Sequence, residues 1–325
     1  MEWGILVNNI KNDIEFTLLE NGLDFILSST QHIDKKDNNK RNIKYSILHM
    51  SSGIELIFKY KLMLTDWKQV FKNVDKADKK NFAEGNFKSI DSKECQNRLK
   101  EVCNVCFSEE EENLLKKLRE KRNKLEHFAI ADSYESLIAY LMKVLNLIVE
   151  FIMNNFENDN FSINERELLD TIRLKIGEIE EFVNHRWIEI KNDVDFYLKQ
   201  GSILQCPSCF QESLVTDGET QCLFCGYTDD SDKVATKYIE KILGINEYRT
   251  VKDGGIYPQY NCPDCGRNSF INDESSEIWK CTHCGVEYND DEVSECSECG
   301  EKYINFMEDD IEMCKDCIDY KLEKD

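Results

Sequence analysis

The sequence predicts an all-α helical bundle over residues 1–160, followed by a long helix and then by small β-rich segments. Apolar residues recur at helical spacing through most of the first 200 positions, which is typical of amphipathic and buried helices. The composition is 41% hydrophobic and 32% charged with only 3 Pro, as expected of a folded, helix-rich chain. Most of the 15 cysteines form CxxC pairs after residue 200, a pattern typical of short segments that lack a core of their own.

The first elements follow from the spacing of apolar side chains. Ile14, Leu18, Leu23 and Ile26 recur at helical spacing and predict an amphipathic first helix. The predicted elements, in order, are a helix over residues 11–33, a polar loop over 34–42, a helix over 43–64, a long and partly irregular connection over 66–91, and a shorter helix over 92–106.

The next helix has a recognisable beginning. Ser108 followed by Glu111 is a capping-box signature, and a run of acidic residues suits a helix N-terminus. We expect this helix to run to about residue 128. A strongly apolar helix over residues 133–156 is expected at the centre of the bundle, and one long helix over residues 164–198 is expected to lead away from it.

The most apolar stretch, residues 137–153, is interrupted by Lys143, Asn146 and Glu150. Such polar residues are costly inside a bilayer, so the stretch is interpreted as a buried helix rather than a membrane span. The N-terminus lacks the basic region and small-residue cleavage site of a signal peptide. Many cysteines without a secretion signal favour metal ligation over disulfides, and a cytoplasmic location is predicted.

Six CxxC pairs can be combined into three sets of four ligands. The gaps inside these sets are 12, 15 and 14 residues, and two such knuckles place four thiolates tetrahedrally around one ion. Because every ligand is a protein atom, no position remains for water or substrate, so each site is expected to hold a structural zinc ion. The predicted ligands are Cys206, Cys209, Cys222 and Cys225; Cys262, Cys265, Cys281 and Cys284; and Cys296, Cys299, Cys314 and Cys317.

Some cysteine and histidine side chains admit a second interpretation. The short gap between Cys284 and Cys296 also permits an interleaved pairing of the last four knuckles. His283 lies inside a knuckle whose site already has four thiolates, so it is interpreted as a non-ligand. The three cysteines within residues 92–106 have no matching second knuckle nearby and are interpreted as ordinary half-buried thiols.

Charge is distributed unevenly along the chain. The formal net charge is −22, and residues 201–325 hold 11 Lys and Arg against 28 Asp and Glu, or −17, which leaves −5 for the first 200 residues. A segment this acidic repels phosphate backbones. We therefore expect the cysteine-rich arm to bind a protein partner rather than nucleic acid, and DNA is not an expected partner.

One basic segment differs from the rest of the chain. The nine residues 116–124 include six basic residues and one acidic residue. One interpretation is a solvated helix face, on which Glu120 and Lys124 form a favourable i,i+4 pair and Arg122 and Glu126 form a weaker one. The order of the residues at the end of this segment favours a second interpretation.

The six residues RNKLEH, 122–127, resemble the R-N-x-x-x-H form of the Arg-x4-His motif of HEPN-domain ribonucleases. Their position late in a helical bundle, just before a strongly apolar helix, adds to the resemblance. A second stretch, residues 49–59, is similar to the helix that packs against the motif helix in many HEPN proteins, and it places Glu55 and Lys59 on one helix face. The resemblance covers residues 1–155 and none of the cysteine-rich arm.

The resemblance implies cleavage of RNA without a catalytic metal, by attack of the ribose 2′-OH to leave a 2′,3′-cyclic phosphate. It implies that His127 acts as general acid or base and that Arg122 binds the scissile phosphate. Asn123 is expected to orient the imidazole of His127 or the phosphate. Arg122 and His127 are about 140° apart around an ideal helix, so a two-fold homodimer with both motifs in one cleft is expected. Glu55 and Lys59 are further catalytic candidates, with a plain surface salt bridge as the alternative.

Other side chains of the bundle are assigned in the same way. Surrounding basic residues are expected to attract RNA without regard to sequence. His127 has the alternative interpretation of a histidine at the edge of the core, and His49 and His185 belong to no clear constellation and are interpreted as structural. The candidate RNA-binding residues are Lys116, Lys117, Arg119, Lys121 and Lys124.

The leading hypothesis is an endoribonuclease of the kind that bacteria use as a toxin or against phage, with tRNA as one candidate substrate and the acidic arm as sensor or regulator. A catalytically silent HEPN module is the first alternative, and the intact Arg-x4-His pair counts against it. A zinc-ribbon adaptor for transcription or translation machinery is the second, and the acidity of the ribbons counts against it.

The expected domains are a HEPN-like bundle over 1–160, a connecting helix over 161–200, a first ribbon over 201–230, a short helical linker over 231–260, and two further ribbons over 261–325.

Overall fold

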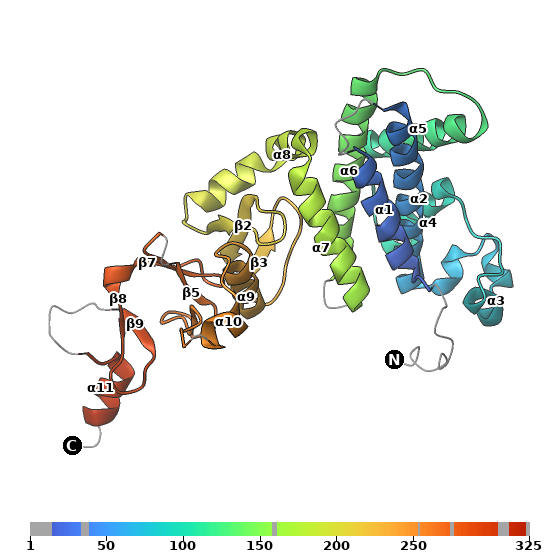
Figure 1. Cartoon of the computed structure of the whole chain (residues 1–325). Helices are drawn as coiled ribbons and strands as arrows, with labels where there is room; N and C mark the ends of the chain where they lie inside the picture. The colour runs from blue at the N-terminus through green and yellow to red at the C-terminus, as the bar shows by residue number, and fades with distance from the viewer. Residues whose placement is uncertain are drawn as a thin grey trace. The chain divides into compact units, whose positions relative to one another are not determined.

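The chain consists of helices followed by short antiparallel strands, with further helices among and after the strands (Figure 1). This agrees with the predicted order of a helical part and small β-rich segments. The backbone divides into two compact units: the first contains Met1–Val144 and Ser162–Leu169, and the second contains Leu145–Phe161 and Asp170–Asp325. The computed structural model describes residues 15–33, 39–157, 161–252, 254–273, 276–304 and 312–322.

The first unit is mainly helical, with an irregular connection over residues 66–91. Its elements are α1 Leu18–Ile33, α2 Lys40–Thr65, the 3-10 turns η1 Trp67–Val70 and η2 Val74–Lys76, α3 Lys79–Ala83, α4 Ser92–Cys103, α5 Glu109–His127, and the first parts of α6 Tyr134–Asn155 and α7 Ile163–Glu178. Helices α1 and α2 lie side by side and run antiparallel (Figure 1), and they supply much of the buried apolar core.

Two glycines allow α1 and α2 to approach closely. A Cβ atom on Gly53 of α2 would lie 2.7 Å from Ile26 Cδ1 and 2.9 Å from the carbonyl oxygen of Gly22. A Cβ atom on Gly22 of α1 would lie 2.9 Å from Ile57 Cγ1. Neither position has room for a side chain, so the glycines set the spacing between the two helices.

The helix boundaries differ from those predicted because polar residues cap the helices. Helix α1 begins at Leu18, since Thr17 Oγ1 accepts a hydrogen bond from the backbone N–H of Glu20 at 3.0 Å; residues 11–14 lie outside the described residues. Helix α2 begins at Lys40 within the predicted loop, because Asn39 caps it. The rest of that loop, residues 34–38, also lies outside the described residues.

Helix α4 ends before the predicted residue 106. Asn104 adopts a left-handed conformation with φ of 55°, which closes the helix after Cys103 and leaves Cys106 exposed outside it. Helix α5 agrees with the prediction. Its N-cap Ser108 accepts from the backbone N–H of Glu111, and the Glu111 carboxylate accepts from the backbone N–H of Ser108.

The connection over residues 66–91 has a small aromatic core of its own. The rings of Phe71 and Phe87 stack with their centroids 4.1 Å apart, and Trp67 and Phe82 pack around them. The Arg98 guanidinium of α4 donates to the backbone carbonyls of residues 69 and 71, at 2.6 and 2.7 Å. These bonds hold the irregular segment against α4.

The second unit begins with the remainder of α6 and α7 and continues into sheets. Its elements are α8 Glu180–Leu198; β1 Ile203–Gln205, β2 Glu212–Asp217 and β3 Glu219–Cys222 in one antiparallel sheet; α9 Ser231–Lys241 and α10 Glu247–Lys252; β4 Gln259–Tyr260, β5 Phe270–Asp273, β6 Ile278–Cys281 and β7 Glu287–Asn289 in a second sheet; η4 Asp290–Glu292; β8 Val293–Glu295 paired with β9 Lys302–Ile304; and α11 Lys315–Leu322.

The prediction of one long helix over residues 164–198 is wrong. The chain breaks at Ile179, which has an extended backbone and is buried, so α7 and α8 are separate helices. The break allows Phe182 and Arg186 of α8 to pack against the first cysteine-rich ribbon: the ring of Phe182 lies 5.6 Å from that of Phe224. Tertiary packing therefore overrides a continuous helical pattern.

Helix α6 is the strongly apolar helix that the sequence predicts. Among the described residues it is the one helix long and apolar enough to cross a membrane, yet 67% of its most apolar window is buried inside the protein. The buried amide of Asn146 donates to the Glu189 carboxylate at 2.6 Å and accepts from Arg186. Burial and these polar partners agree with a core helix.

Candidate functional site

Each predicted set of four cysteines converges on one point. In every set the four Sγ atoms lie within 4.8 Å of one another, and the sets follow the chain in order rather than interleaving. Four bonds of about 2.3 Å in a tetrahedron place the sulfur atoms about 3.8 Å apart. The nearest Sγ pairs are Cys209–Cys222 at 3.7 Å, Cys262–Cys284 at 3.8 Å and Cys299–Cys314 at 3.7 Å. The donor sets therefore fit one metal ion each.

Backbone amides point at the sulfur atoms, as they do around bound thiolates. The N–H of Ser208 donates to Cys206 Sγ and the N–H of Cys225 donates to Cys222 Sγ, both at 3.4 Å. His283 contributes its backbone N–H to Cys281 Sγ and lies outside the sulfur cluster. Such N–H···S bonds stabilise negative charge on sulfur, so the knuckles are built for thiolates.

The three cysteine clusters differ in burial. All four cysteines of the first cluster are buried, two of four are buried in the second, and one of four is buried in the third, where Cys299 is exposed. The second cluster has a small core in which Phe270 and Trp279 stack with centroids 5.1 Å apart. Protection from solvent therefore decreases from the first cluster to the third.

Two buried arginines attach the second knuckle of the first cluster to the helices. Arg186 of α8 donates to the carbonyl oxygens of Leu223 at 2.8 Å and Phe224 at 3.1 Å. Arg173 of α7 donates to the carbonyl oxygen of Gly226 at 3.1 Å. The Arg186 charge is balanced by Glu150 of α6 at 2.6 Å. The first metal site is thus part of the helical packing of the second unit.

The RNKLEH segment forms the last turns of α5. Leu115 and Leu118 anchor the helix to the core, whereas Asn123 and His127 lie exposed near its C-terminal end. The His127 side chain is 77% exposed. The next residue, Phe128, is 90% exposed although it is aromatic. This end of α5 is therefore open to solvent and to any large ligand.

Glu126 brings Arg122 and His127 together. One oxygen, Glu126 Oε2, lies 3.0 Å from Arg122 Nε and 3.9 Å from His127 Nε2. Arg122 also donates to Asn123 Oδ1 at 3.3 Å. Arg122 is within hydrogen-bond distance of this oxygen, and the His127 ring lies near it but beyond hydrogen-bond distance, although the two positions are far apart around the helix. The sequence indicated the Arg122–Glu126 pair but not that His127 joins it.

Glu55 and Lys59 form a pair between a half-buried carboxylate and a buried lysine rather than a plain surface salt bridge. Lys59 Nζ lies 2.6 Å from Glu55 Oε1 and 3.1 Å from Ser89 Oγ, and the lysine side chain is 9% exposed. Within the described residues, no hydrogen bond or ion pair connects either side chain to α5. The pair holds the segment around Ser89 against α2, and the structure does not bring it to the RNKLEH segment.

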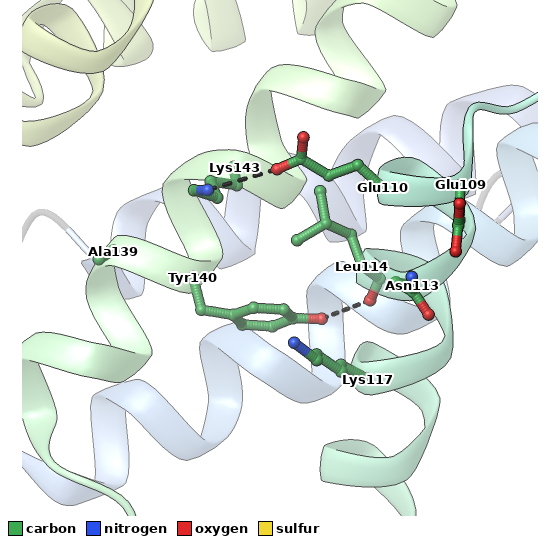
Figure 2. A pocket seen from close by; sticks show the side chains of 8 residues that line it. All are labelled: Glu109, Glu110, Asn113, Leu114, Lys117, Ala139, Tyr140 and Lys143. Atoms are coloured by element: carbon green, nitrogen blue, oxygen red, sulfur yellow. Dashed lines mark hydrogen bonds and ion pairs between the residues drawn. The ribbon is translucent and has the colours of Figure 1, made fainter.

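The candidate RNA-binding residues point in different directions from α5. Lys121 pairs with Asp132 at 2.6 Å and lies over the ring of Tyr140. Lys117 lines a pocket between α5 and α6, which Figure 2 shows with Tyr140 donating to the carbonyl oxygen of Leu114 at 2.7 Å. Burial raises the pKa of the Tyr140 hydroxyl, which keeps it a donor. Another lysine of this pocket, Lys143, pairs with Glu110 at 3.5 Å.

Two other candidates, Lys116 and Arg119, line a different pocket, between α4 and α5. Lys124 is exposed at the motif end of the helix. The predicted basic surface is therefore divided: one part faces α6, another faces α4, and a third lies beside the motif. Nothing in the sequence pattern indicates this division, because it depends on which helices flank α5.

A histidine pair occupies the contact between α1 and α2. His49 Nδ1 lies 2.9 Å from Ser28 Oγ, and the rings of His49 and His32 are 5.6 Å apart. Burial lowers the pKa of His49, and the nearby His32 lowers it further, while Asp24 opposes the change. No sequence pattern indicates this pair, since the two residues lie on different helices.

No protein-family model matches the chain, and no curated protein or solved structure matches it. The HEPN resemblance therefore rests on residues 122–127 and 49–59 themselves. The arrangement of the RNKLEH segment and of the cysteine clusters is the basis on which function is inferred.

Proposed function

We propose that the chain is a metal-independent endoribonuclease of the HEPN type, with three structural zinc ions in its cysteine clusters. The observation that carries the proposal is the convergence of Arg122 and His127 on one oxygen of Glu126 at the open end of α5. A phosphate oxygen is also an anionic acceptor and binds such donors in the same way. The pair is therefore suited to hold a phosphodiester once RNA displaces the Glu126 carboxylate.

The chemistry follows from the side chains. The ribose 2′-oxygen attacks the adjacent phosphorus, the bond from phosphorus to the 5′-oxygen breaks, and a 2′,3′-cyclic phosphate remains. His127 removes the 2′-OH proton or protonates the leaving 5′-oxygen, and Arg122 stabilises the charge on the phosphate oxygens. Asn123 donates to the phosphate or orients the arginine. A second His127 from a two-fold partner supplies the complementary proton transfer.

The exposed end of α5 also supports the homodimer. Phe128 is 90% exposed directly beside His127, and such an aromatic side chain is typical of a surface that another protein covers. The acidic ribbons carry a net charge of −17 from residue 201 onward and act as a regulatory arm for a protein partner. In this proposal the enzyme is a cytoplasmic toxin or defence effector that acts on RNA.

The test is cleavage of total RNA and tRNA by the purified protein in EDTA, with zinc content measured afterwards to show that the ribbons remain loaded. Arg122→Ala and His127→Ala are compared with Lys79→Ala, which removes an exposed charge from α3. We expect 2′,3′-cyclic phosphate ends with the wild type and with Lys79→Ala. Both motif variants are expected to lose cleavage by at least about 100-fold, because general acid–base catalysis contributes that much.

The contrary outcomes are equally clear. Cleavage that persists in His127→Ala contradicts the mechanism, and 3′-hydroxyl ends contradict the reaction type. A wild type that binds RNA with an affinity that depends on Arg122 but never cleaves it favours the catalytically silent HEPN module.

A further inference from the structure

A second pocket of about 280 Å³ lies between α4 and α5, next to the pocket in Figure 2, with which it shares the lining residue Asn113. Its lining is strongly basic. Lys93 and Lys100 from α4 and Lys116 and Arg119 from α5 supply four cations, whereas Glu112 is the single carboxylate among the described lining residues. A concentration of positive charge in a protein of net charge −22 is unusual and points to an anionic ligand.

Two donors in this pocket have no acceptor. Gln96 Nε2 and Arg119 Nη1 are buried side-chain nitrogens without a hydrogen-bond partner. Burial lowers the pKa of Arg119, and the carboxylates of Asp91 and Glu120 offset this only in part. A buried donor that lacks a partner destabilises the protein by about 1–3 kcal/mol, and by more when it is charged. A bound acceptor removes this penalty.

The cations of the pocket lack close ion pairs with carboxylates of the described residues. None of Lys93, Lys100 and Lys116 forms an ion pair within the part of the chain that the structure describes, and the same holds for Arg119. The pocket in Figure 2 differs, because Lys143 there faces Glu110 at 3.5 Å. The α4–α5 pocket is thus arranged for a negative charge that comes from outside the chain.

We propose that the α4–α5 pocket binds a phosphate group, carried either by a small phosphorylated compound or by an RNA strand. The side chains of Arg119 and Gln96 line the pocket, and they turn their unpartnered nitrogens toward the phosphate oxygens when it binds. The three lysines neutralise its charge from the open side, where their flexible stems let them approach.

The pocket and the RNKLEH segment share one face of α5. Lys116, Arg119, Asn123 and His127 recur at intervals of three or four residues, and Arg119 lies about 12 Å from His127 along the helix axis. A strand whose phosphate is held in the pocket can therefore extend toward His127. This form of the proposal rests on the proposed nuclease activity, whereas binding of a small phosphorylated compound does not.

The experiment is thermal unfolding of the full-length protein in inorganic phosphate and in chloride at equal ionic strength. AMP and an uncleavable all-deoxy oligonucleotide are the second and third probes. Arg119→Met keeps the aliphatic stem without the charge. Lys116→Gln is matched by Lys79→Gln, which removes an exposed charge from α3. We expect phosphate to raise the Tm of the wild type and of Lys79→Gln, and to do so less for Lys116→Gln.

Arg119→Met is expected to have a higher Tm than the wild type without phosphate, because the unpaired buried charge is gone, and to lose the phosphate-dependent shift. A general salt effect on stability acts on both proteins equally. Equal shifts in the wild type and Arg119→Met, or no shift in the wild type with any probe, would overturn the proposal. Gln96→Leu gives the same comparison if Arg119→Met does not fold.

The probes separate the two sources of phosphate. A response to phosphate and AMP without a response to the oligonucleotide identifies a small compound, and the reverse identifies a strand. Arg122→Ala and His127→Ala are expected to keep the part of the phosphate response that depends on Arg119. Failure of the nuclease proposal is therefore distinguishable from failure of this one.

Discussion

At the scale of single residues, Glu126 both positions and occupies the candidate active site. Its carboxylate lies within 4 Å of Arg122 and His127, so it competes with a phosphate for the same donors. Glu126→Gln keeps the shape of the side chain and removes its charge. An exposed ion pair is worth about 0.2–1 kcal/mol, so RNA affinity is expected to rise about two- to five-fold. Glu120→Gln, an exposed change of equal charge on the same helix, is the control in a filter-binding or anisotropy titration.

A gain of equal size in both glutamate variants would show a general charge effect and contradict a specific competition. A loss of affinity in Glu126→Gln alone would show that the carboxylate organises Arg122 more than it competes with RNA.

The histidine pair predicts how stability depends on pH. The pKa of His49 is lowered in the folded protein, so the unfolded chain binds its proton more readily. Protonation therefore favours unfolding, and stability is lost as the pH falls through the unfolded value of about 6.5. The positive charge of His32 adds to this loss, whereas Asp24 opposes it.

His49→Gln is expected to reduce this loss of stability. The glutamine amide can still bond to Ser28 but carries no titrating group, so the fall in unfolding free energy between pH 7 and pH 5 should be smaller than in the wild type. Urea denaturation of both proteins at the two pH values measures the difference. Equal falls would show that His49 does not contribute.

At the scale of elements, the spacing of α1 and α2 depends on Gly53. Gly53→Ala is expected to lower the unfolding free energy by about 1–3 kcal/mol, since the added methyl would overlap Ile26 and the backbone at Gly22. In an open helix the same change stabilises, because alanine is the better helix former. Ser52→Ala is the control, as its hydroxyl bonds only to Leu48 O of its own helix. A more stable Gly53→Ala protein would contradict the close packing.

Much of the helical order could be predicted because its signals are local. The capping box at Ser108 and the apolar run of α6 depend on neighbours within a few residues, and both were predicted closely. The left-handed cap at Asn104 also depends on local sequence, but a single asparagine is a weak signal for the end of a helix. The break at Ile179 was not predictable, because its cause is the packing of Phe182 and Arg186 on a ribbon far along the chain.

The same distinction applies to the sites. The cysteine clusters could be predicted because the CxxC knuckle and its spacing are carried by the chain itself. The shared Glu126 oxygen and the unpaired donors at Gln96 and Arg119 depend on side-chain directions and on which helix lies beside α5. Glu55 and Lys59 show the converse case, since helical spacing indicated the pair but not that Lys59 also donates to Ser89 of the connecting segment.

At the scale of the whole molecule, the burial of the cysteines predicts the order of metal release. With zinc bound, a chromogenic chelator is expected to remove metal fastest from the third cluster and slowest from the first, because access decreases in that order. Cys299→Ser should abolish the fastest phase and Cys206→Ser the slowest. Arg186→Met should accelerate the slowest phase alone, since it frees the second knuckle of the first cluster. Release in one uniform phase would contradict this hierarchy.

The arginine contacts of the first ribbon limit which foreign ribbons can replace it by recombination. A foreign four-cysteine ribbon grafted in place of residues 203–228 would still ligate metal, yet it would have to present carbonyl oxygens to Arg173 and Arg186 in the same positions. Without them, two buried guanidinium groups would keep their carboxylate partners, Asp170 and Glu150, but would lose their backbone acceptors. The third ribbon, in which Cys299 is exposed, does not have to present carbonyl oxygens to these arginines. Homologous exchange is therefore expected to spare the first ribbon and to diversify the last.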